Sequence, residues 1–402
     1  MLRPIRKVRM PIINRIAEFR DDMTAWRRDI HAHPETAFEE VRTSDVVAKR
    51  LAEFGIEVDR GLAGTGVVGT LKGARGDGPA IGLRADLDAL HIHEKNTFDH
   101  KSTIDGKMHA CGHDGHTTML LGAARYLAET RNFAGTVHFI FQPAEENEGG
   151  ARVMVEEGLF DKYPVESVFG MHNMPGLEVG EMAVRGGPIM AAFDIFEITV
   201  TGYGTHAAAP HLGKDAVLAA AEIITSLQCI ASRSVDPQDS VVVSVTQIHG
   251  GDTWNVIPED VVLRGTVRAF KPEIQDLAET SIRRIAEGVA AVHDMTVAID
   301  YQRRYPPTIN DHTEADFTAS VMAGVVGKDN VFRNKNPKMA SEDFAYMLNE
   351  KPGAYVWLGN GPGEGGCLLH NPSYDFNDDA LTIGASYWSR LVETRLSDRI
   401  AS

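Results

Sequence analysis

The segment 108–116, Met-His-Ala-Cys-Gly-His-Asp-Gly-His, is unusually dense in side chains that bind metals. Cys111 and His113 stand two residues apart in a glycine-containing loop, and a thiolate together with imidazole nitrogens suits zinc and other first-row divalent ions. Taken alone, the same pair is explained equally well by polar residues that cap a following helix. The segment therefore indicates a metal site only if other parts of the chain supply further ligands.

Further candidate ligands follow short apolar strands, at the edge where α/β sheets place their sites. They are Glu145 and Glu146 after a strand at 136–141, His172 after a strand at 167–171, and His370 beyond a strand at 355–358 and a glycine-rich loop. The side chains of adjacent glutamates diverge, so one can bind metal while the other faces the substrate as a proton acceptor. Singly, each of these residues is also explained as an acidic turn or a buried structural histidine.

The elements that would position these residues predict an α/β domain with a mostly parallel sheet, because buried apolar strands alternate with helices. We expect strands at 66–71, 80–83, 136–141, 167–171 and 355–358, and helices at 16–30, 39–54 and 117–129. The hydrophobic pattern changes beyond Pro188. There we expect strands at 193–203, 240–249 and 260–270 and helices at 215–232 and 273–292. This order predicts a small open-faced α+β domain.

The domain prediction follows from that change of pattern. We expect a discontinuous catalytic, metal-binding domain of residues 1–188 and 297–402, into which a second domain of residues 189–296 is inserted. A length of 402 residues fits two domains.

The composition excludes several classes of protein. The chain has 40 Lys and Arg against 56 Asp and Glu, a formal net charge of −16, so we expect no nucleic-acid partner. Three widely spaced cysteines exclude a disulfide scaffold and favour a reducing compartment. No stretch approaches the roughly 20 apolar residues of a membrane span. We therefore expect a cytoplasmic protein without a membrane partner.

Together, the candidate segments resemble the M20 metallopeptidase superfamily, specifically its aminoacylase/hippurate hydrolase branch. They occur in the family's order and cover nearly the whole chain. The segments are 29–35 (DIHAHPE), 84–90 (RADLDAL), 106–116 (GKMHACGHDGH), 141–146 (FQPAEE), 171–175 (MHNMP), 255–258 (NVIP), 265–270 (GTVRAF), 341–346 (SEDFAY) and 369–376 (LHNPSYDF).

The resemblance implies two divalent metal ions per subunit, with Zn, Mn, Co and Ni as the candidates. The ligands that it implies are Cys111, His113, Glu146, His172 and His370, with Cys111 bridging both ions. Glu145 matches the general base of the family. Asp86 matches an acidic residue that does not bind the metal but orients its ligands.

For the inserted domain, the resemblance implies a dimerisation or lid domain and assembly as a homodimer or a dimer-based homotetramer. His206 matches a histidine that reaches the active site of the partner subunit and stabilises the oxyanion there. Asn255 and Arg268 match residues that hold the carboxylate side of the substrate, for which an arginine fork is suited. From the residues alone, Arg268 is better explained as a surface charge.

The activity implied by the resemblance is metal-dependent hydrolysis of the amide bond of small-molecule N-acyl-L-amino acids, which releases a carboxylic acid and a free amino acid. A metallo-carboxypeptidase or dipeptidase and an N-acetyl-diaminoacid deacetylase of the same family remain alternatives. Three residues depart from the family pattern: His91 stands where proline is usual, Thr205 where glycine or alanine is commoner, and Asn147 where glycine is usual.

Other interpretations are weaker. His31 and His33 suggest a TIM-barrel amidohydrolase, but they follow a polar helix end, and eight βα units are missing. Cys111 as a thiol nucleophile is disfavoured because nearby carboxylates would raise its pKa. A binding module with a structural metal would seldom keep a spare carboxylate such as Glu145 beside the ligands. Cys229 is expected in the core, and Cys367 is left without a role.

Overall fold

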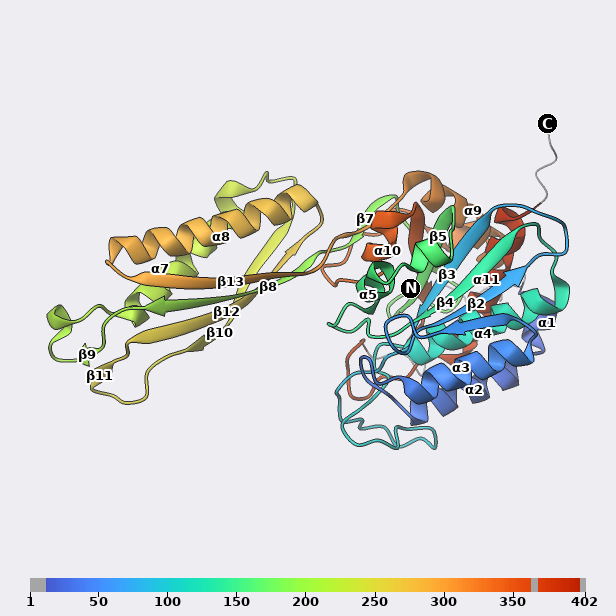
Figure 1. Cartoon of the computed structure of the whole chain (residues 1–402), viewed down its shortest axis with the longest axis horizontal. Coiled ribbons are helices and arrows are strands. Elements are labelled where there is room, and N and C mark those ends of the chain that lie inside the picture. The colour runs from blue at the N-terminus through green and yellow to red at the C-terminus, as the bar shows by residue number, and fades with distance from the viewer. Residues whose placement is uncertain (1–11, 363–367, 398–402) are drawn as a thin grey trace, which may run out of the picture. The chain divides into compact units, whose positions relative to one another are not determined.

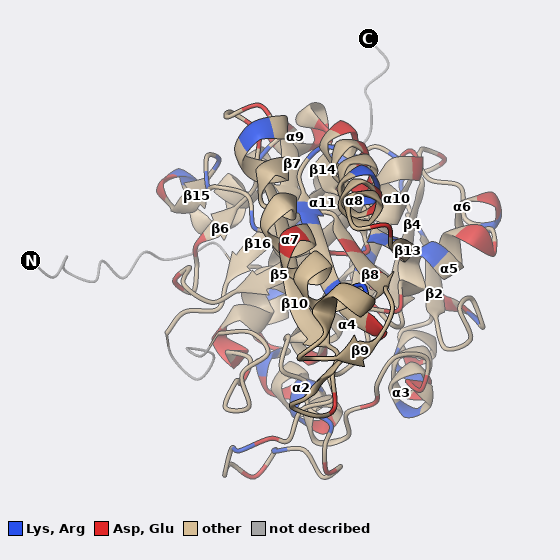
Figure 2. Ribbon diagram, turned by 90° about the vertical axis from the view of Figure 1, so that its left-hand side faces the viewer, with Lys and Arg blue, Asp and Glu red and all other residues tan. Residues whose placement is uncertain are grey.

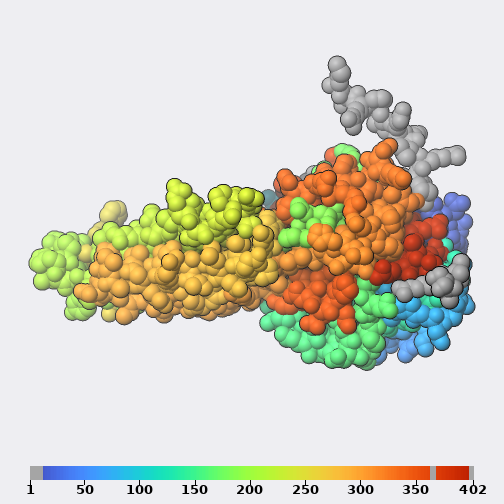
Figure 3. Space-filling model, turned by 90° about the horizontal axis from the view of Figure 1, so that it is seen from above, coloured from blue at the N-terminus to red at the C-terminus, as the bar shows by residue number. Residues whose placement is uncertain are grey.

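The computed structural model describes residues 12–362 and 368–397. The chain divides into two compact units. The first unit contains the segment up to Gly187, then Ile309–Asn336 and the segment from Tyr346 onward, and the second contains Pro188–Thr308 and Pro337–Ala345. Figure 3 shows that the blue beginning and the red end of the chain lie side by side in the first unit. One unit is thus inserted into the sequence of the other.

The first unit is built on an eight-stranded sheet of order β1-β2-β4-β3-β5-β16-β6-β15 (Figure 1). Its strands are β1 Glu57–Arg60, β2 Val67–Lys72, β3 Ala80–Asp86, β4 Thr136–Gln142, β5 Ser167–Met174, β6 Met182–Ala183, β15 Val331–Phe332 and β16 Gly353–Gly359. The central strands β4, β3, β5 and β16 are mutually parallel, and antiparallel pairs occur toward the edges. The predicted α/β class with a mostly parallel sheet is confirmed.

Continuous apolar sequence explains why these central strands are covered on both sides. Every residue of β16 is buried, as is every residue of β5 except the last. The helices of this unit are α1 Asn14–Ala17, α2 Arg20–Ala32, α3 Val41–Glu53, α4 His113–Thr130, α5 Gly150–Glu156, α6 Leu159–Lys162, α9 His312–Val326, α10 Ala345–Glu350 and α11 Leu381–Arg395. Charged residues gather on surface helices such as α3 and α6 and on loops (Figure 2). The sheet and helices together enclose one large hydrophobic core.

The second unit contains a four-stranded antiparallel sheet of order β10-β12-β8-β13. Helices α7 and α8 contact each other and the sheet, as Figure 1 shows. The elements are β8 Phe193–Thr201, β10 Val241–His249, β12 Asp260–Ala269, β13 Thr296–Tyr305, α7 Ala216–Leu227, α8 Pro272–Val292, and a small ribbon of β9 Thr205–His206 and β11 Val256–Ile257. Alternate residues of β8 are buried, which is typical of a sheet with one face on a core.

The boundary of this unit differs from the prediction. The inserted domain was predicted to end at residue 296, but Thr296 begins β13, which pairs with β8 along its length. The unit therefore continues to Thr308. The connection runs through β7 Gly187–Met190 and β14 Thr308–Asn310, which form a two-stranded ladder. Short turns of 3-10 helix at Pro210–Leu212, Lys328–Asn330 and Asp378–Ala380 and of π-helix at Ile230–Ser234 complete the elements.

By length and composition alone, one helical stretch within the described residues, Ala216–Ser234, could cross a membrane. One face of it is buried in the second unit through Ala216, Ala219, Ala220, Ile223 and Leu227. Val217 and Leu218 on α7 are exposed. Part of the apolar composition of this stretch is therefore explained by the face that packs on the core, whereas Val217 and Leu218 lie on the surface of the second unit.

Candidate metal centre

Gly112 separates two of the predicted ligands, Cys111 and His113, at the start of α4. Its φ of 97° lies in the left-handed region, and a Cβ added there would lie 2.3 Å from Oδ1 of Asn173. Only glycine fits this close approach. The helix begins at His113 itself, four residues earlier than predicted, so the first turn of α4 fixes the direction of that imidazole.

The structure brings all five predicted ligands together in two overlapping groups. The ligand atoms of Cys111, His113 and His172 lie within 4.8 Å of one another, and so do those of Cys111, Glu146 and His370. Sγ of Cys111 is 3.3 Å from Nε2 of His172, and Nε2 of His370 is 3.2 Å from Oε1 of Glu146. Because Cys111 belongs to both groups, the arrangement suits two ions that share one thiolate.

His113 and His172 each use Nδ1 in a hydrogen bond to a backbone carbonyl, as metal-binding imidazoles usually do. Nδ1 of His113 donates to the backbone carbonyl of Asp88 over 2.9 Å. Nε2 of His113 is buried and has no hydrogen-bond partner among the described residues. Nδ1 of His172 donates to the carbonyl of Asn173 over 2.6 Å, inside β5 rather than beyond its end as predicted. The donor set and this orphaned nitrogen fit a dinuclear divalent-metal centre.

The two adjacent glutamates lie in a turn with unusual backbone geometry. Ala144 and Asn147, on either side of them, have φ values of 54° and 70°. Asparagine tolerates the left-handed region better than most residues, which explains how it replaces the glycine usual at position 147. Within this turn, Glu145 and Glu146 place carboxylate oxygens within 4.8 Å of a ligand nitrogen of His113.

Asp86 lies at the end of β3 and is fully buried. Its carboxylate accepts from Nδ1 of His116 over 2.7 Å and from Arg84 over 2.6 Å, and it lies 3.8 Å from Nε2 of His113. Burial alone would raise the pKa of Asp86, but the two histidines and Arg84 hold it well below its usual range. The carboxylate is thus an anion placed against the imidazoles.

The environment of Cys111 bears on the thiol-nucleophile alternative. Burial, followed by the charges of Glu146, Glu145 and Asp86, raises the pKa of the Cys111 thiol well above its ordinary value. A thiolate is the nucleophilic form, so these surroundings oppose thiol catalysis. A divalent cation offsets the same carboxylates, which makes the site consistent with a metal-bound cysteine.

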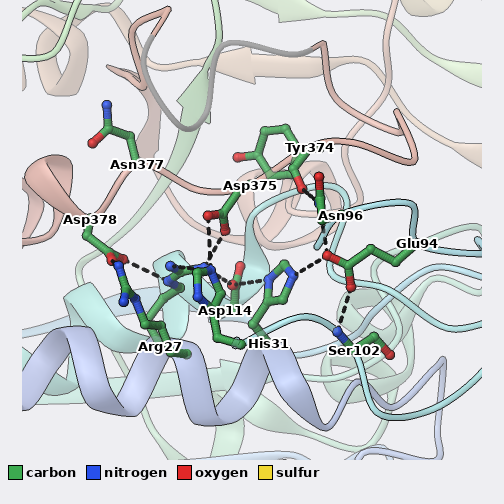
Figure 4. A network of polar contacts seen from close by, with 12 residues as sticks. Arg27, His31, Glu94, Asn96, Ser102, Asp114, Tyr374, Asp375, Asn377 and Asp378 are labelled. Carbon is green, nitrogen blue, oxygen red and sulfur yellow. Dashed lines mark hydrogen bonds and ion pairs between the residues drawn. The ribbon is translucent and has the colours of Figure 1, made fainter. Parts of the chain in front are cut away.

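A buried ionic network supports two of the ligand segments (Figure 4). Arg27 of α2 lies 3.4 Å from Asp114, the neighbour of His113, and donates to Asp375 and Asp378, which follow His370 in the chain. His31 of the same helix bonds Asp114 over 2.9 Å and Glu94 over 3.2 Å. His31 therefore belongs to a structural network next to the site.

Three predicted site residues lie in the second unit. His206 belongs to β9 and Asn255 directly precedes β11, and the amide of Ala207 donates to the carbonyl of Asn255 over 2.9 Å. Both are exposed, and the neighbouring Trp254 has a relative exposure of 102%. Arg268 of β12 is half-buried, stacks on Phe193 at 4.0 Å and donates to Ser341 over 2.8 Å. No carboxylate of the described ranges forms an ion pair with it.

Asp88 and Glu40, which were not predicted as site residues, hold the loops of the site by hydrogen bonds to backbone amides. Asp88 stands two residues after Asp86, so its place in the same segment could have indicated a role at the site. No feature of the sequence distinguishes Glu40 from other acidic residues. Cys229 was expected in the core but is exposed, because it follows the buried face of α7. Cys367 lies outside the described residues.

Comparisons with known proteins agree with this geometry. The model of peptidase family M20/M25/M40 matches residues 82–394. The chain is 42% identical over 383 residues to a hippurate hydrolase of Campylobacter jejuni, covering 95% of this chain and 99% of that protein. It is 40% identical to an N-acetylcysteine deacetylase of Bacillus subtilis, covering 93% of this chain and 97% of that protein.

Among solved structures, the chain resembles the YXEP protein of Bacillus subtilis, described as a dinuclear metal-binding peptidase of the M20 family. The TM-score is 0.83 at 37% identity, with 94% of this chain and 99% of that chain covered. An aminohydrolase-like protein of Staphylococcus aureus aligns with a TM-score of 0.90 at 31% identity, covering 96% and 99% of the two chains. The family model, which matches more than half of the chain, and these near full-length relatives show that the chain belongs to peptidase family M20/M25/M40.

Proposed function

We propose that this chain is a metal-dependent amidohydrolase that cleaves the amide bond of N-acyl-L-amino acids into a carboxylic acid and a free amino acid. The observation that carries the proposal is the pair of ligand groups that share Cys111, with the carboxylate of Glu145 beside them. The relatives named hippurate hydrolase and N-acetylcysteine deacetylase act on substrates of this kind.

The proposed ligands are Cys111, His113, Glu146, His172 and His370, with Asp86 orienting the imidazoles. When bound, two divalent ions would polarise the substrate carbonyl and acidify water. Zn²⁺, Mn²⁺, Co²⁺ and Ni²⁺ all suit a thiolate, imidazole and carboxylate set. Glu145 would accept the proton of the attacking water and then deliver it to the leaving amine. Its position inside a turn with left-handed residues at both ends supports a fixed orientation.

The second unit would bind the other parts of the substrate. Arg268 has a guanidinium without a carboxylate partner among the described residues, which supports binding of the substrate carboxylate, with Asn255 assisting. His206 would donate to the oxyanion that forms at the attacked carbonyl. The exposure of His206 and Asn255 supports a role in the active site of a neighbouring subunit.

A homodimer, or a tetramer built from dimers, follows from that proposal. Apolar side chains of the second unit are exposed, and such groups mark interaction surfaces when they lie together. They include Tyr203, Leu212, Val217, Leu218, Val242, Ile248, Trp254 and Val256. We also propose a cytoplasmic location, which the free thiols of Cys111 and Cys229 within the described residues support.

A substrate panel tests the activity. Hippurate, N-acetyl amino acids, long-chain N-acyl amino acids and dipeptides would each be supplied with Mn²⁺ or Zn²⁺, and amino acid release would be measured. We expect hydrolysis of N-acyl amino acids, its loss with chelator and its recovery with metal. A carboxypeptidase remains the second candidate because the chain is 35% identical to a thermostable carboxypeptidase of Saccharolobus solfataricus. Preferential cleavage of dipeptides would favour it.

A further inference from the structure

We propose that Glu40 is a positioning residue for Glu145: its buried carboxylate fixes the backbone turn that aims the general base. The inference rests on the role proposed above for Glu145 and adds a residue that touches neither metal nor substrate.

The side chain of Glu40 forms its hydrogen bonds with residues outside α3. Glu40 precedes α3, yet its side chain makes no capping hydrogen bond there. Instead, Oε1 accepts from the backbone amide of Ala144 over 2.9 Å and from that of Phe38 over 3.1 Å. Oε2 accepts from the hydroxyl of Thr65 over 2.7 Å. The carboxylate therefore links the start of α3 to the residue that directly precedes Glu145.

The backbone that Glu40 holds requires such an anchor. Ala144 adopts a φ of 54°, a conformation that residues with a side chain adopt only where their surroundings enforce it. Its carbonyl accepts from the amide of Gly150 over 2.9 Å. A Cβ on Gly150 would lie 1.8 Å from the carbonyl oxygen of Pro143, so the turn is closed tightly at this point as well. Removal of one anchor allows Ala144 to relax toward ordinary φ values.

The two amides that flank Glu145 are bound by two different carboxylates. Glu40 accepts from the amide of Ala144, and Asp88 accepts from that of Glu146 over 2.8 Å. Burial, and then the charge of Asp88, raises the pKa of Glu40 to about 7. The hydrogen bonds from the amides of Ala144 and Phe38 and from the hydroxyl of Thr65 oppose this effect and hold the carboxyl group against the turn.

Because Glu40 and Asp88 bind different amides of the turn, loss of Glu40 should impair catalysis without loss of metal. Loss of the Glu40 carboxylate leaves the buried amide of Ala144 without its acceptor, while Asp88 still holds Glu146. Glu146, the proposed metal ligand, then stays in place, whereas Glu145, the proposed general base, moves. Because a displacement of about 1 Å at a catalytic group can cost on the order of 100-fold in rate, the loss should appear in kcat.

Three variants of the metal-loaded full chain test this. Glu40→Ala should lower kcat by about 10- to 100-fold, with metal content unchanged and KM within about threefold. Glu40→Gln keeps a carbonyl oxygen for the amide of Ala144 and should retain kcat within about threefold. Glu35→Ala is the matched control, because Glu35 accepts from the amides of Arg42 and Thr43 in the same helix and does not touch the turn. It should lower the melting temperature and leave kcat unchanged.

Hydrogen exchange measured by mass spectrometry supplies a readout that does not need activity. Peptides covering 142–150 should exchange faster in Glu40→Ala than in the wild type, and at the wild-type rate in Glu40→Gln. Unchanged exchange in Glu40→Ala, or unchanged kcat with faster exchange, would overturn the positioning role. A wild type that hydrolyses no N-acyl amino acid would instead overturn the proposed function, and exchange alone would then decide whether Glu40 anchors the turn.

Discussion

Nδ1 of His113 donates to the backbone carbonyl oxygen of Asp88 over 2.9 Å, and Nε2 of the same ring is buried without a hydrogen-bond partner among the described residues. The carboxylate of Asp88 also lies 3.2 Å from that ring and accepts from the amide of Glu146. One residue between β3 and the metal-ligand loop thus orients two proposed ligands that come from different parts of the chain.

Loss of the Asp88 side chain should weaken metal binding, because its carboxylate holds the amide of Glu146 and lies beside the ring of His113, although the backbone carbonyl that accepts from His113 remains. We expect Asp88→Ala to lower metal affinity by about 10- to 100-fold, as is usual when a group that orients a metal ligand is removed. Metal content after dialysis against graded chelator concentrations measures this. Asp88→Asn keeps an acceptor for the amide of Glu146 and should lose less. Equal metal retention in the wild type and both variants would contradict the assignment.

Residue 147 should tolerate glycine but not a β-branched residue. Asn147 has a φ of 70° directly after the two glutamates. Asn147→Gly should change the free energy of unfolding by less than about 1 kcal/mol, whereas Asn147→Val should cost about 1–2 kcal/mol because its branched side chain opposes this conformation. Urea unfolding with saturating metal measures both. A valine variant as stable as the glycine variant would argue against a left-handed residue here.

The ligand set could be predicted from the sequence because each ligand belongs to a recognisable residue type near the end of an apolar strand. The supporting carboxylates could not, because their function depends on distant backbone. Glu40 meets Ala144 from 104 residues away, and Asp88 meets Glu146 from 58 residues away. The sequence does not show from which backbone amide an acidic side chain accepts a hydrogen bond in the folded protein.

The fold was predictable where the hydrophobic pattern was strong. The central strands of the parallel sheet and helices α3 and α8 lie within a few residues of the expected ranges. Strand β13 was missed because it is an edge strand with many exposed polar residues, such as Asp300 and Gln302, and it moved the boundary of the second unit. The start of α4 at His113 was missed because the close approach of Asn173 to Gly112 is a tertiary contact.

His31 should make stability depend on pH. Burial alone would lower its pKa, but hydrogen bonds with Asp114 and Glu94 raise the pKa of His31 to about 9. Because the pKa of His31 is higher in the folded than in the unfolded state, the protonated ring stabilises the folded protein fully below about pH 6.5, the ordinary pKa of histidine. This contribution disappears as the pH rises through 9. The wild type should lose up to about 3 kcal/mol across that window. His31→Gln should lack this slope in urea unfolding at pH 6.5, 7.5 and 9, and parallel slopes would refute the prediction.

The proposed sharing of the active site between subunits predicts complementation. His206→Ala and Glu145→Gln should each be nearly inactive while they retain metal. In a random mixture, half of the dimers contain one subunit of each kind, and one of their two sites is complete. About a quarter of wild-type activity should therefore return after subunit exchange. No recovery, although mass analysis shows mixed dimers, would contradict a His206 that acts in the partner.

The most direct test of the central claim compares the wild type with Glu145→Gln in hydrolysis of N-acyl amino acids, with bound metal measured in the same samples. We expect two metal ions per subunit in both proteins and a fall in kcat of about 100- to 10,000-fold in the variant, because the amide of glutamine cannot accept the proton of water. Full activity in Glu145→Gln with normal metal content would contradict it.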